Sequence, residues 1–237
     1  MRDFIPYGRH FVDEDDIKAV SGVLRSEYLT GGQVVEQFED SFASVVGAKY
    51  AVACSSGTAA LHLASLAAGL SNSFQAVVPT ITFLATANAP KYTGAEIIFS
   101  DVNRDTGLIC AEELKRILDH SKGDIKAVFV VHLNGQSADI EAINNLCKNQ
   151  GILVIEDACH ALGGKYHSQK EGWQPTGSGK HSDMAVFSMH PVKNIAMGEG
   201  GMVVTNNRDF FNRLKLFRNH GMTRIPSDFT LREFGFD

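Results

Sequence analysis

A turn rich in hydroxyl groups is the first feature of this sequence that could do chemistry. Ser55-Ser56-Gly57-Thr58 follows a short apolar run and precedes an Ala/Leu-rich segment with a helical pattern. Free backbone N–H groups, a permissive glycine and hydroxyls at a helix N-terminus suit an anion such as phosphate. The same residue types also cap helices without binding a ligand. Ser56, Gly57 and Thr58 are therefore candidates for a phosphate site, with a simple helix cap as the alternative.

An acidic residue closes the most apolar of the expected strands, in the segment Glu156-Asp157-Ala158-Cys159-His160. A carboxylate at the end of a buried strand is costly unless a cation or hydrogen-bond donors satisfy it. A protonated pyridine nitrogen would be such a cation, although Asp157 could also cap the following loop. His160 could stack on a ligand, hydrogen-bond to it, or serve only as a structural histidine.

A lysine follows in Phe187-Ser188-Met189-His190-Pro191-Val192-Lys193-Asn194, just before Gly198-Glu199-Gly200-Gly201. Desolvation in an apolar, glycine-rich setting makes an amine easier to deprotonate and gives a usable nucleophile. Ser188 could add a hydroxyl to the phosphate site. A lone lysine is also a common surface residue.

Together, these three features are the parts that a pyridoxal phosphate (PLP) enzyme requires. A lysine amine binds the cofactor covalently, a carboxylate keeps the pyridine protonated, and a hydroxyl-rich turn holds the phosphate. The sequence therefore indicates PLP as the cofactor, with Lys193 as the catalytic residue and Asp157 as the partner of the pyridine.

Alternating helical and buried-strand patterns run from about residue 13 to residue 220 and must position these groups. Apolar runs at 127–131 and 152–155 cover both strand faces, which is typical of a sheet with helices on each side. The pattern predicts one α/β domain. Its expected strands are 50–54, 75–78, 96–100, 126–132, 152–156, 185–189 and 201–205. Three helices are expected from their ends, namely one capped by Asp13, one ending at Gly47 and one ending near Gly69. Further helices are expected near 82–91, 111–119, 138–149 and 208–219.

Composition argues against several other classes of protein. The chain has 22 Lys+Arg and 27 Asp+Glu, a net charge of −5, so it offers no basic surface for nucleic acid or an anionic membrane. The most apolar stretch, 59–70, is shorter than the ~20 residues that span a bilayer. Four scattered cysteines indicate reduced thiols rather than a disulfide framework. We therefore expect a soluble cytoplasmic protein.

Rival motifs are incomplete. Gly177-Ser178-Gly179-Lys180-His181-Ser182 lacks the third glycine of a dinucleotide fingerprint and the flanking residues of a P-loop. The sequence has no G-x-S-x-G hydrolase motif. The nine histidines form no metal-binding pair with a glutamate, so no metal is expected.

Read in order, several segments strongly resemble the DegT-type family of PLP-dependent sugar aminotransferases. The matching segments are Pro6-Tyr7-Gly8-Arg9, Leu29-Thr30-Gly31, Ser56-Gly57-Thr58-Ala59-Ala60-Leu61-His62, Thr82-Phe83-Leu84-Ala85-Thr86-Ala87-Asn88, Glu156-Asp157-Ala158-Cys159-His160-Ala161 and Gly198-Glu199-Gly200-Gly201. The resemblance implies the large domain of aminotransferase fold type I, with a mostly parallel sheet covered by helices on both faces.

The family's chains continue into a smaller C-terminal domain. We therefore expect residues 1–237 to be the PLP-binding large domain of an incomplete chain. At the end of the sequence, Gly235-Phe236-Asp237 stands where the family has Gly-x-Asn-Tyr-Arg, with an aspartate in place of the asparagine that reaches a neighbouring subunit's phosphate.

The resemblance also implies a role for individual residues. Lys193 would form the Schiff base and move protons, and Asp157 would pair with the pyridinium. The remaining cofactor-binding residues would be Ser56, Gly57, Thr58 and Ser188 at the phosphate, Phe83 stacked on the ring and His160 nearby, while Tyr7, Tyr28, Leu29 and Thr30 would border the nucleotide-sugar pocket. Phe83 could alternatively be plain core packing.

Within the family, residues 186–193 and 216–222 are most similar to the members that act in pseudaminic acid biosynthesis. The implied reaction transfers an amino group from glutamate to C4 of a UDP-linked 4-keto-6-deoxy amino sugar, in a homodimer. The alternatives are an aminotransferase for another nucleotide-linked keto-sugar, or a non-catalytic regulatory module that binds PLP or a sugar nucleotide. Lys193 argues against the regulatory module, because such a module needs no reactive amine.

Overall fold

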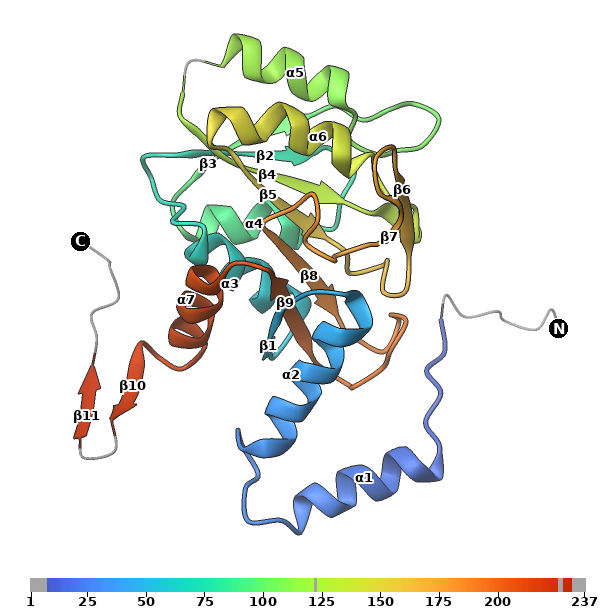
Figure 1. Cartoon of the computed structure of the whole chain (residues 1–237), viewed down its shortest axis with the longest axis vertical. Coiled ribbons are helices and arrows are strands. Elements are labelled where there is room, and N and C mark those ends of the chain that lie inside the picture. Colours follow the sequence, from blue (N-terminus) through green and yellow to red (C-terminus); the bar gives the residue numbers. More distant parts are fainter. Residues whose placement is uncertain (1–7, 122, 226–227, 232–237) are drawn as a thin grey trace, which may run out of the picture.

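A seven-stranded sheet crosses the molecule in the computed structural model, which describes residues 8–121, 123–225 and 228–231 (Figure 1). The strand order is β1-β9-β8-β5-β4-β2-β3. Neighbouring strands from β8 to β3 are parallel, whereas β9 is antiparallel to both β8 and β1. The strands are β1 (Tyr50–Cys54), β2 (Gln75–Pro79), β3 (Glu96–Ser100), β4 (Ile125–Val131), β5 (Leu153–Asp157), β8 (Met184–Ser188) and β9 (Gly201–Thr205). The predicted mostly parallel α/β sheet is confirmed.

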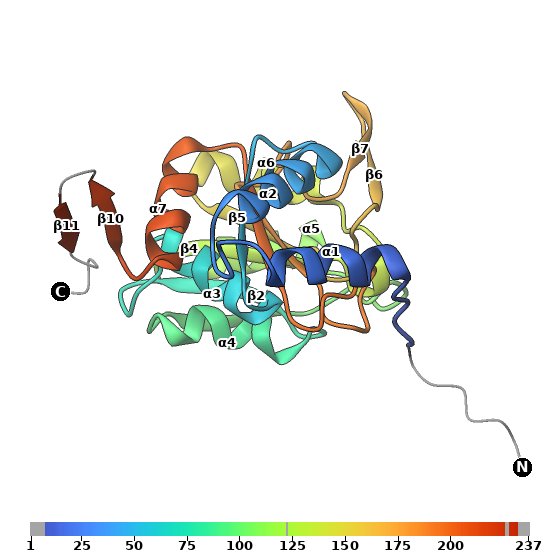
Figure 2. The same cartoon turned by 90° about the horizontal axis from the view of Figure 1, so that it is seen from below.

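Helices cover both faces of this sheet, as the continuous apolar strand patterns predict. Alternate side chains of β4 enter different cores, with Phe129 on one face and Val128 on the other. The Phe129 face packs against α3 (Gly57–Ala67), α4 (Leu84–Tyr92) and α7 (Arg208–Arg218), and the opposite face packs against α2 (Gln33–Val46), α5 (Ala111–His120) and α6 (Ile140–Cys147). Figure 2 shows α3 and α4 below the sheet and α2 and α6 above it.

The helix boundaries follow local signals in the sequence. Asp13 caps α1 (Glu14–Leu24) in a capping box with Asp16, as expected from an N-terminal aspartate. Gly47 ends α2 in the left-handed conformation, with φ 76°, which glycine adopts without a steric penalty.

The apolar face of α1 is not packed in the described part of the chain. Ile17, Val20 and Leu24 recur at helical spacing, yet each is about half exposed or more, and α1 has no buried residue. Figure 1 shows α1 apart from the sheet. The helical spacing of these residues thus predicted the helix correctly but did not establish where its apolar face packs.

Two short hairpins lie where no strand was predicted. β6 (Lys165–Ser168) pairs with β7 (Gly172–Pro175), and β10 (Met222–Ile225) pairs with β11 (Asp228–Leu231). Strands of four residues give too few alternations to be detected against glycine-rich or polar surroundings.

Every helix in the part of the chain that the structure describes is too short or too polar to span a lipid bilayer.

Strand register brings the candidate functional segments to one edge of the sheet. Gly201 of β9 pairs with Cys54 on one side and with Ser188 on the other, and Asp157 pairs with Val186 of the next strand. Because β1, β8 and β5 point the same way, their carboxyl ends meet there. The segments that follow Cys54, Asp157 and Ser188 therefore begin side by side.

A partly buried ion pair between Glu39 and Arg218 anchors β1 beside this edge. Glu39 of α2 is 5% exposed and accepts hydrogen bonds from the Ala53 backbone N–H (2.8 Å) and from Arg218 of α7. Arg218 also donates to the Ala53 carbonyl oxygen. These contacts tie two helices to the strand that leads into the Ser55–Thr58 turn.

Removing the Glu39 carboxylate should destabilise the fold. Glu39→Ala leaves the Ala53 N–H and the Arg218 guanidinium without their acceptor and should cost about 2–4 kcal/mol of unfolding free energy. Urea denaturation measures the loss. Lys115→Ala, which breaks the exposed Lys115–Asp119 pair, is the control and should leave the midpoint almost unchanged. Equal effects of the two variants would contradict the anchoring role.

Candidate functional site

A cavity of about 560 Å³ lies at the carboxyl edge of the sheet. Its size is within the usual range of small-molecule sites, about 300–1,000 Å³. The cavity is lined by Ser56, Gly57, Thr58, Leu61, Phe83, Ala85, Val131, Leu133, Asp157, Cys159, His160, Ser188, His190, Val192, Lys193 and Glu199. All eight predicted cofactor-binding residues are in this set, so the structure brings together four segments that lie far apart in the sequence.

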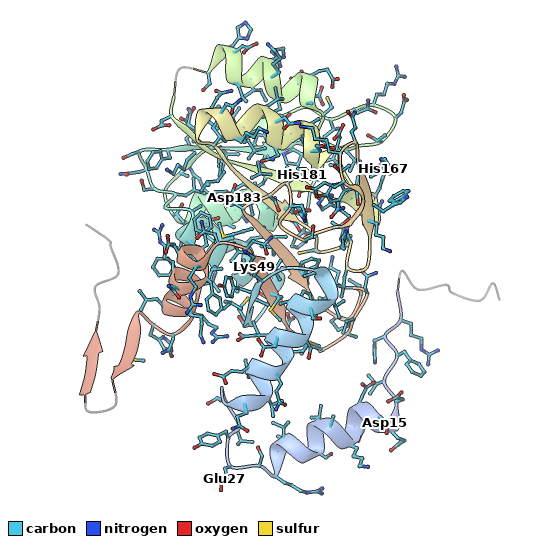
Figure 3. All side chains as sticks on the ribbon, viewed as in Figure 1. Asp15, Glu27, Lys49, His167, His181 and Asp183 are labelled. Carbon is cyan, nitrogen blue, oxygen red and sulfur yellow. The ribbon has the colours of Figure 1, made fainter. Side chains whose placement is uncertain are left out.

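Three of the predicted nucleotide-sugar residues, Tyr28, Leu29 and Thr30, do not line this cavity. They are exposed in the loop between α1 and α2. Figure 3 shows their neighbour Glu27 at that loop, away from the sheet. Tyr7 and the Gly235–Asp237 segment lie outside the described residues. The assignment of these residues to substrate remains a prediction.

The N-terminus of α3 forms one end of the cavity. Ser56 caps this helix, because its hydroxyl accepts a hydrogen bond from the Ala59 backbone N–H at 3.1 Å. The capping alternative is thus realised by the Ser56 hydroxyl. The N–H groups of Gly57 and Thr58 precede the first helical bond, from Ala60 N–H to the Ser56 carbonyl, and remain available at the positive end of the helix dipole.

Gly57 is placed too close to β8 to carry a side chain. A Cβ atom at this position would lie 2.8 Å from Ser188 Cβ and 3.2 Å from both Ser188 Oγ and Cys159 Sγ. The first turn of α3 therefore sits directly against the end of β8. The Ser188 hydroxyl lies beside the α3 N-terminus, where it can contribute to the same anion site.

Asp157 is 5% exposed and accepts hydrogen bonds from Thr86 and Cys159. The Thr86 hydroxyl donates to Oδ2 at 2.6 Å, and the Cys159 backbone N–H donates to Oδ1 at 3.2 Å. The second bond is the loop-capping contact considered as an alternative. A carboxylate has about four acceptor positions, so capacity is left for a cationic group in the cavity.

His160 is neutral at physiological pH. Burial lowers its pKa from the ordinary 6.5, and the positive charge of Lys193 lowers it further, although Asp157 acts in the opposite direction. The Asn134 backbone N–H donates to Nδ1 at 3.2 Å, so the ring proton is on Nε2. His160 is therefore a neutral N–H donor at the cavity.

Lys193 is half-buried in the loop after β8, where its backbone N–H donates to the His190 carbonyl oxygen at 2.8 Å. Its charge acts on both His160 and Cys159. The Cys159 thiol stays protonated, because burial and the nearby Asp157 carboxylate raise its pKa. Lys193 is therefore the cavity residue whose amine can act as a nucleophile.

Glu156, beside Asp157 in the chain, belongs to a separate buried network. His132 accepts a hydrogen bond at Nδ1 from the Ala138 N–H, so Nε2 carries the proton that faces Glu156 Oε2 at 2.8 Å. Glu156 also accepts from the Gly177 N–H and the Ser182 hydroxyl. These donors satisfy the Glu156 charge without a ligand, which distinguishes it from Asp157.

Sequence reasoning assigned no role to several residues at the site. His190 and Glu199 line the cavity within segments that had been singled out for other residues. Thr86 lies behind Asp157, and a helical threonine gives no signal of such a contact because the Asp157 side chain is 71 positions away. In the described ranges, no group of three His, Cys, Asp or Glu side chains could hold a metal ion.

Comparisons with known proteins agree with one another. The model of the DegT/DnrJ/EryC1/StrS aminotransferase family matches residues 11–237. The UDP-4-amino-4,6-dideoxy-N-acetyl-beta-L-altrosamine transaminase of Campylobacter jejuni is 39% identical over 220 residues, which are 93% of this chain and 56% of that relative. The chain thus spans little more than half the length of this curated relative.

Solved structures show the same similarity. PseC of Helicobacter pylori, an aminotransferase involved in the biosynthesis of pseudoaminic acid, is 29% identical with a TM-score of 0.85, over 98% of this chain and 60% of that chain. NtdA of Bacillus subtilis, solved with bound cofactor PMP, is 29% identical with a TM-score of 0.76, over 89% of this chain and 46% of that chain.

The charge of Lys193 should be detectable through His160. In Lys193→Ala, the pKa of His160 should rise toward 6.5, because one of the two causes that lower it is removed while burial remains. NMR titration of the imidazole carbons measures this change. Lys115→Ala removes an exposed lysine on α5 and should leave the His160 titration unchanged. A titration that is the same in Lys193→Ala and in the unmodified chain would show that the two side chains do not interact.

Proposed function

The chain belongs to the DegT/DnrJ/EryC1/StrS aminotransferase family, and we propose that residues 1–237 are the PLP-binding large domain of a nucleotide-sugar aminotransferase. One observation carries the proposal. Lys193, Asp157 and the N-terminus of α3 line a single cavity, although they come from three separate strand ends. PLP has three matching parts, namely an aldehyde carbon, a pyridine nitrogen and a phosphate.

The residues present fit PLP at each of these parts. The close contact at Gly57 leaves backbone N–H groups and the Ser188 hydroxyl around a space suited to a phosphate. Asp157 offers a buried carboxylate with spare acceptor capacity to a pyridinium N–H. Phe83 is 71% exposed and lines the cavity, so it is available for stacking rather than occupied in core packing.

When bound, PLP would supply an electron-accepting ring that stabilises negative charge on the substrate carbon bearing nitrogen. Asp157 would hold the proton on the pyridine nitrogen, because an anion beside that nitrogen favours its protonated form. Phe83 would fix the plane of the ring. His160, as a neutral donor at Nε2, would hydrogen-bond an oxygen without adding positive charge next to Lys193.

Lys193 would serve both to bind and to transfer protons. Its amine would hold the cofactor covalently in the resting protein. When it is not bonded to the cofactor, Lys193 Nζ would serve as the base that accepts and returns a substrate proton. Glutamate would leave as 2-oxoglutarate, and the carbonyl at C4 of the sugar would become an amine.

The proposed acceptor is a UDP-linked 4-keto-6-deoxy amino sugar, in pseudaminic acid or related surface-glycan biosynthesis. This choice is supported by the name of the 39% identical relative and by the pathway of the similar solved structure. Tyr7, Tyr28, Leu29 and Thr30 are proposed to contact the sugar nucleotide.

We further propose a cytoplasmic homodimer. Two exposed apolar side chains that line the cavity, Phe83 and Val192, would suit contact with a second copy. Their neighbours in the sequence add further exposed apolar side chains: Ile81, Leu84, Ile195 and Met197.

Covalent binding at Lys193 should be visible by absorbance. PLP added to the purified chain should give a visible band that glutamate bleaches, because the lysine is then displaced and the amino group transferred. Lys193→Ala should abolish the band. Lys180→Ala, at an exposed lysine in a loop, should leave it intact. A band that persists in Lys193→Ala would rule out this lysine.

The phosphate site can be tested separately at Gly57. Gly57→Ala should weaken PLP binding about tenfold, because the added Cβ separates Ser188 from the α3 N-terminus and a charge-assisted hydrogen bond contributes about 1.5–3 kcal/mol. Fluorescence titration gives the dissociation constant. Gly22→Ala, where a Cβ meets open space, is the control. Unchanged binding by Gly57→Ala would place the phosphate elsewhere.

A further inference from the structure

Two threonine hydroxyls lie in line behind Asp157. Thr86, at 0% exposure in the first turn of α4, has its Oγ1 2.6 Å from Asp157 Oδ2, and Thr82 Oγ1 is 2.7 Å from Thr86 Oγ1. An ionised carboxylate only accepts hydrogen bonds, so Thr86 donates its single proton to Asp157. Thr86 must then accept the proton of Thr82. The direction of both hydrogen bonds is therefore fixed by the negative charge.

We propose that the Thr82–Thr86 hydroxyl pair positions the Asp157 carboxylate for the pyridine nitrogen of the cofactor. This inference rests on the proposed function, because it assigns the pair a role only toward a bound pyridine. Neither hydroxyl is proposed to touch the cofactor. Each acts through Asp157, so both are positioning residues.

The hydrogen bond from Thr86 to Asp157 supports a role for this threonine beyond helix formation. A threonine inside a helix commonly turns its hydroxyl to a carbonyl of the preceding turn. Thr86 instead reaches an acidic side chain 71 positions away in the chain. This contact is also the shorter of the two to Asp157, because the Cys159 N–H on Oδ1 is 3.2 Å away.

The same helical turn also carries Phe83 into the cavity. The Thr86 backbone N–H donates to the Phe83 carbonyl oxygen at 3.1 Å and closes the turn between them. Phe83 and Ala85 line the cavity, while Thr86 lies behind its wall. One turn of α4 therefore sets both the residue proposed to stack on the ring and the orientation of the carboxylate proposed to bind its nitrogen.

The two hydroxyls act on the carboxylate in sequence. The first hydroxyl is polarised by the second, and such chains strengthen each bond in a low-dielectric interior. Thr86→Val keeps the β-branched shape and removes only the donor. Thr86→Ser keeps the donor and removes a methyl group, which makes it the matched control.

The test compares PLP dissociation constants, by absorbance titration, for the unmodified chain, Thr86→Val, Thr86→Ser, Thr82→Val and the double Val variant. Thr86→Val should weaken PLP binding about tenfold, which is the lower end of the range expected for the loss of a hydrogen bond to a charged group. Thr86→Ser should stay within about twofold of the unmodified chain, because the donor to the charge is retained. Thr82→Val should be intermediate, and the double variant should bind no more weakly than Thr86→Val, because Thr82 acts only through Thr86.

A second probe isolates the pyridine nitrogen. With an analogue in which carbon replaces this nitrogen, the unmodified chain and Thr86→Val should bind equally. Thermal unfolding of the cofactor-free variants tests for a merely structural role. Such a role would lower the melting temperature but would leave the ratio of the dissociation constants for PLP and the carbon analogue the same in Thr86→Val as in the unmodified chain.

The outcomes separate this inference from the function on which it rests. Failure of the unmodified chain to bind PLP through Lys193 overturns both. If PLP does bind through Lys193, three results would overturn the role of the threonine pair alone. These are normal PLP binding by Thr86→Val, weakened PLP binding by Thr86→Ser, and a weaker affinity of Thr86→Val for the carbon analogue than that of the unmodified chain.

Discussion

The site depends on the close packing of the β9 backbone against the turn that follows β1. A Cβ atom on Gly201 would lie 2.1 Å from the Ser56 carbonyl oxygen, so only glycine allows the two backbones to approach this far. Gly201 at the same time pairs with Cys54 and Ser188. The packing therefore sets the α3 N-terminus against the end of β8, where Gly57 and Ser188 make the next close contact.

The charged groups around this framework differ in how the protein satisfies them. Asp157 is buried with two donors and faces a cavity, whereas Glu156, one residue earlier, has its charge satisfied by the protein itself. Alternation along β5 sends the two carboxylates to opposite faces of the sheet. Burial and Lys193 both lower the pKa of His160, so this ring adds no positive charge to that of the lysine and the helix end. Such a distribution suits a ligand with an anionic end and a protonated ring nitrogen.

Much of this arrangement could be predicted from the sequence. The central strands were correctly predicted because apolar runs such as 127–131 are buried on both faces. The candidate cofactor-binding residues could be expected to lie together, because they lie at or after the ends of strands and parallel strand ends meet at one edge. The packing of α1 could not be predicted, because the spacing of Ile17, Val20 and Leu24 gives a helix but no partner surface. Thr86 was missed for a similar reason, since its partner is distant in sequence.

The most direct test of the central claim locates the covalent bond. The PLP-loaded chain is reduced with borohydride, digested and mapped by mass spectrometry. We expect a single pyridoxyl-modified peptide that carries the label on Lys193, because this lysine lines the cavity with Asp157 and the α3 N-terminus. A label spread over surface lysines, or fixed on any lysine other than Lys193, would contradict it.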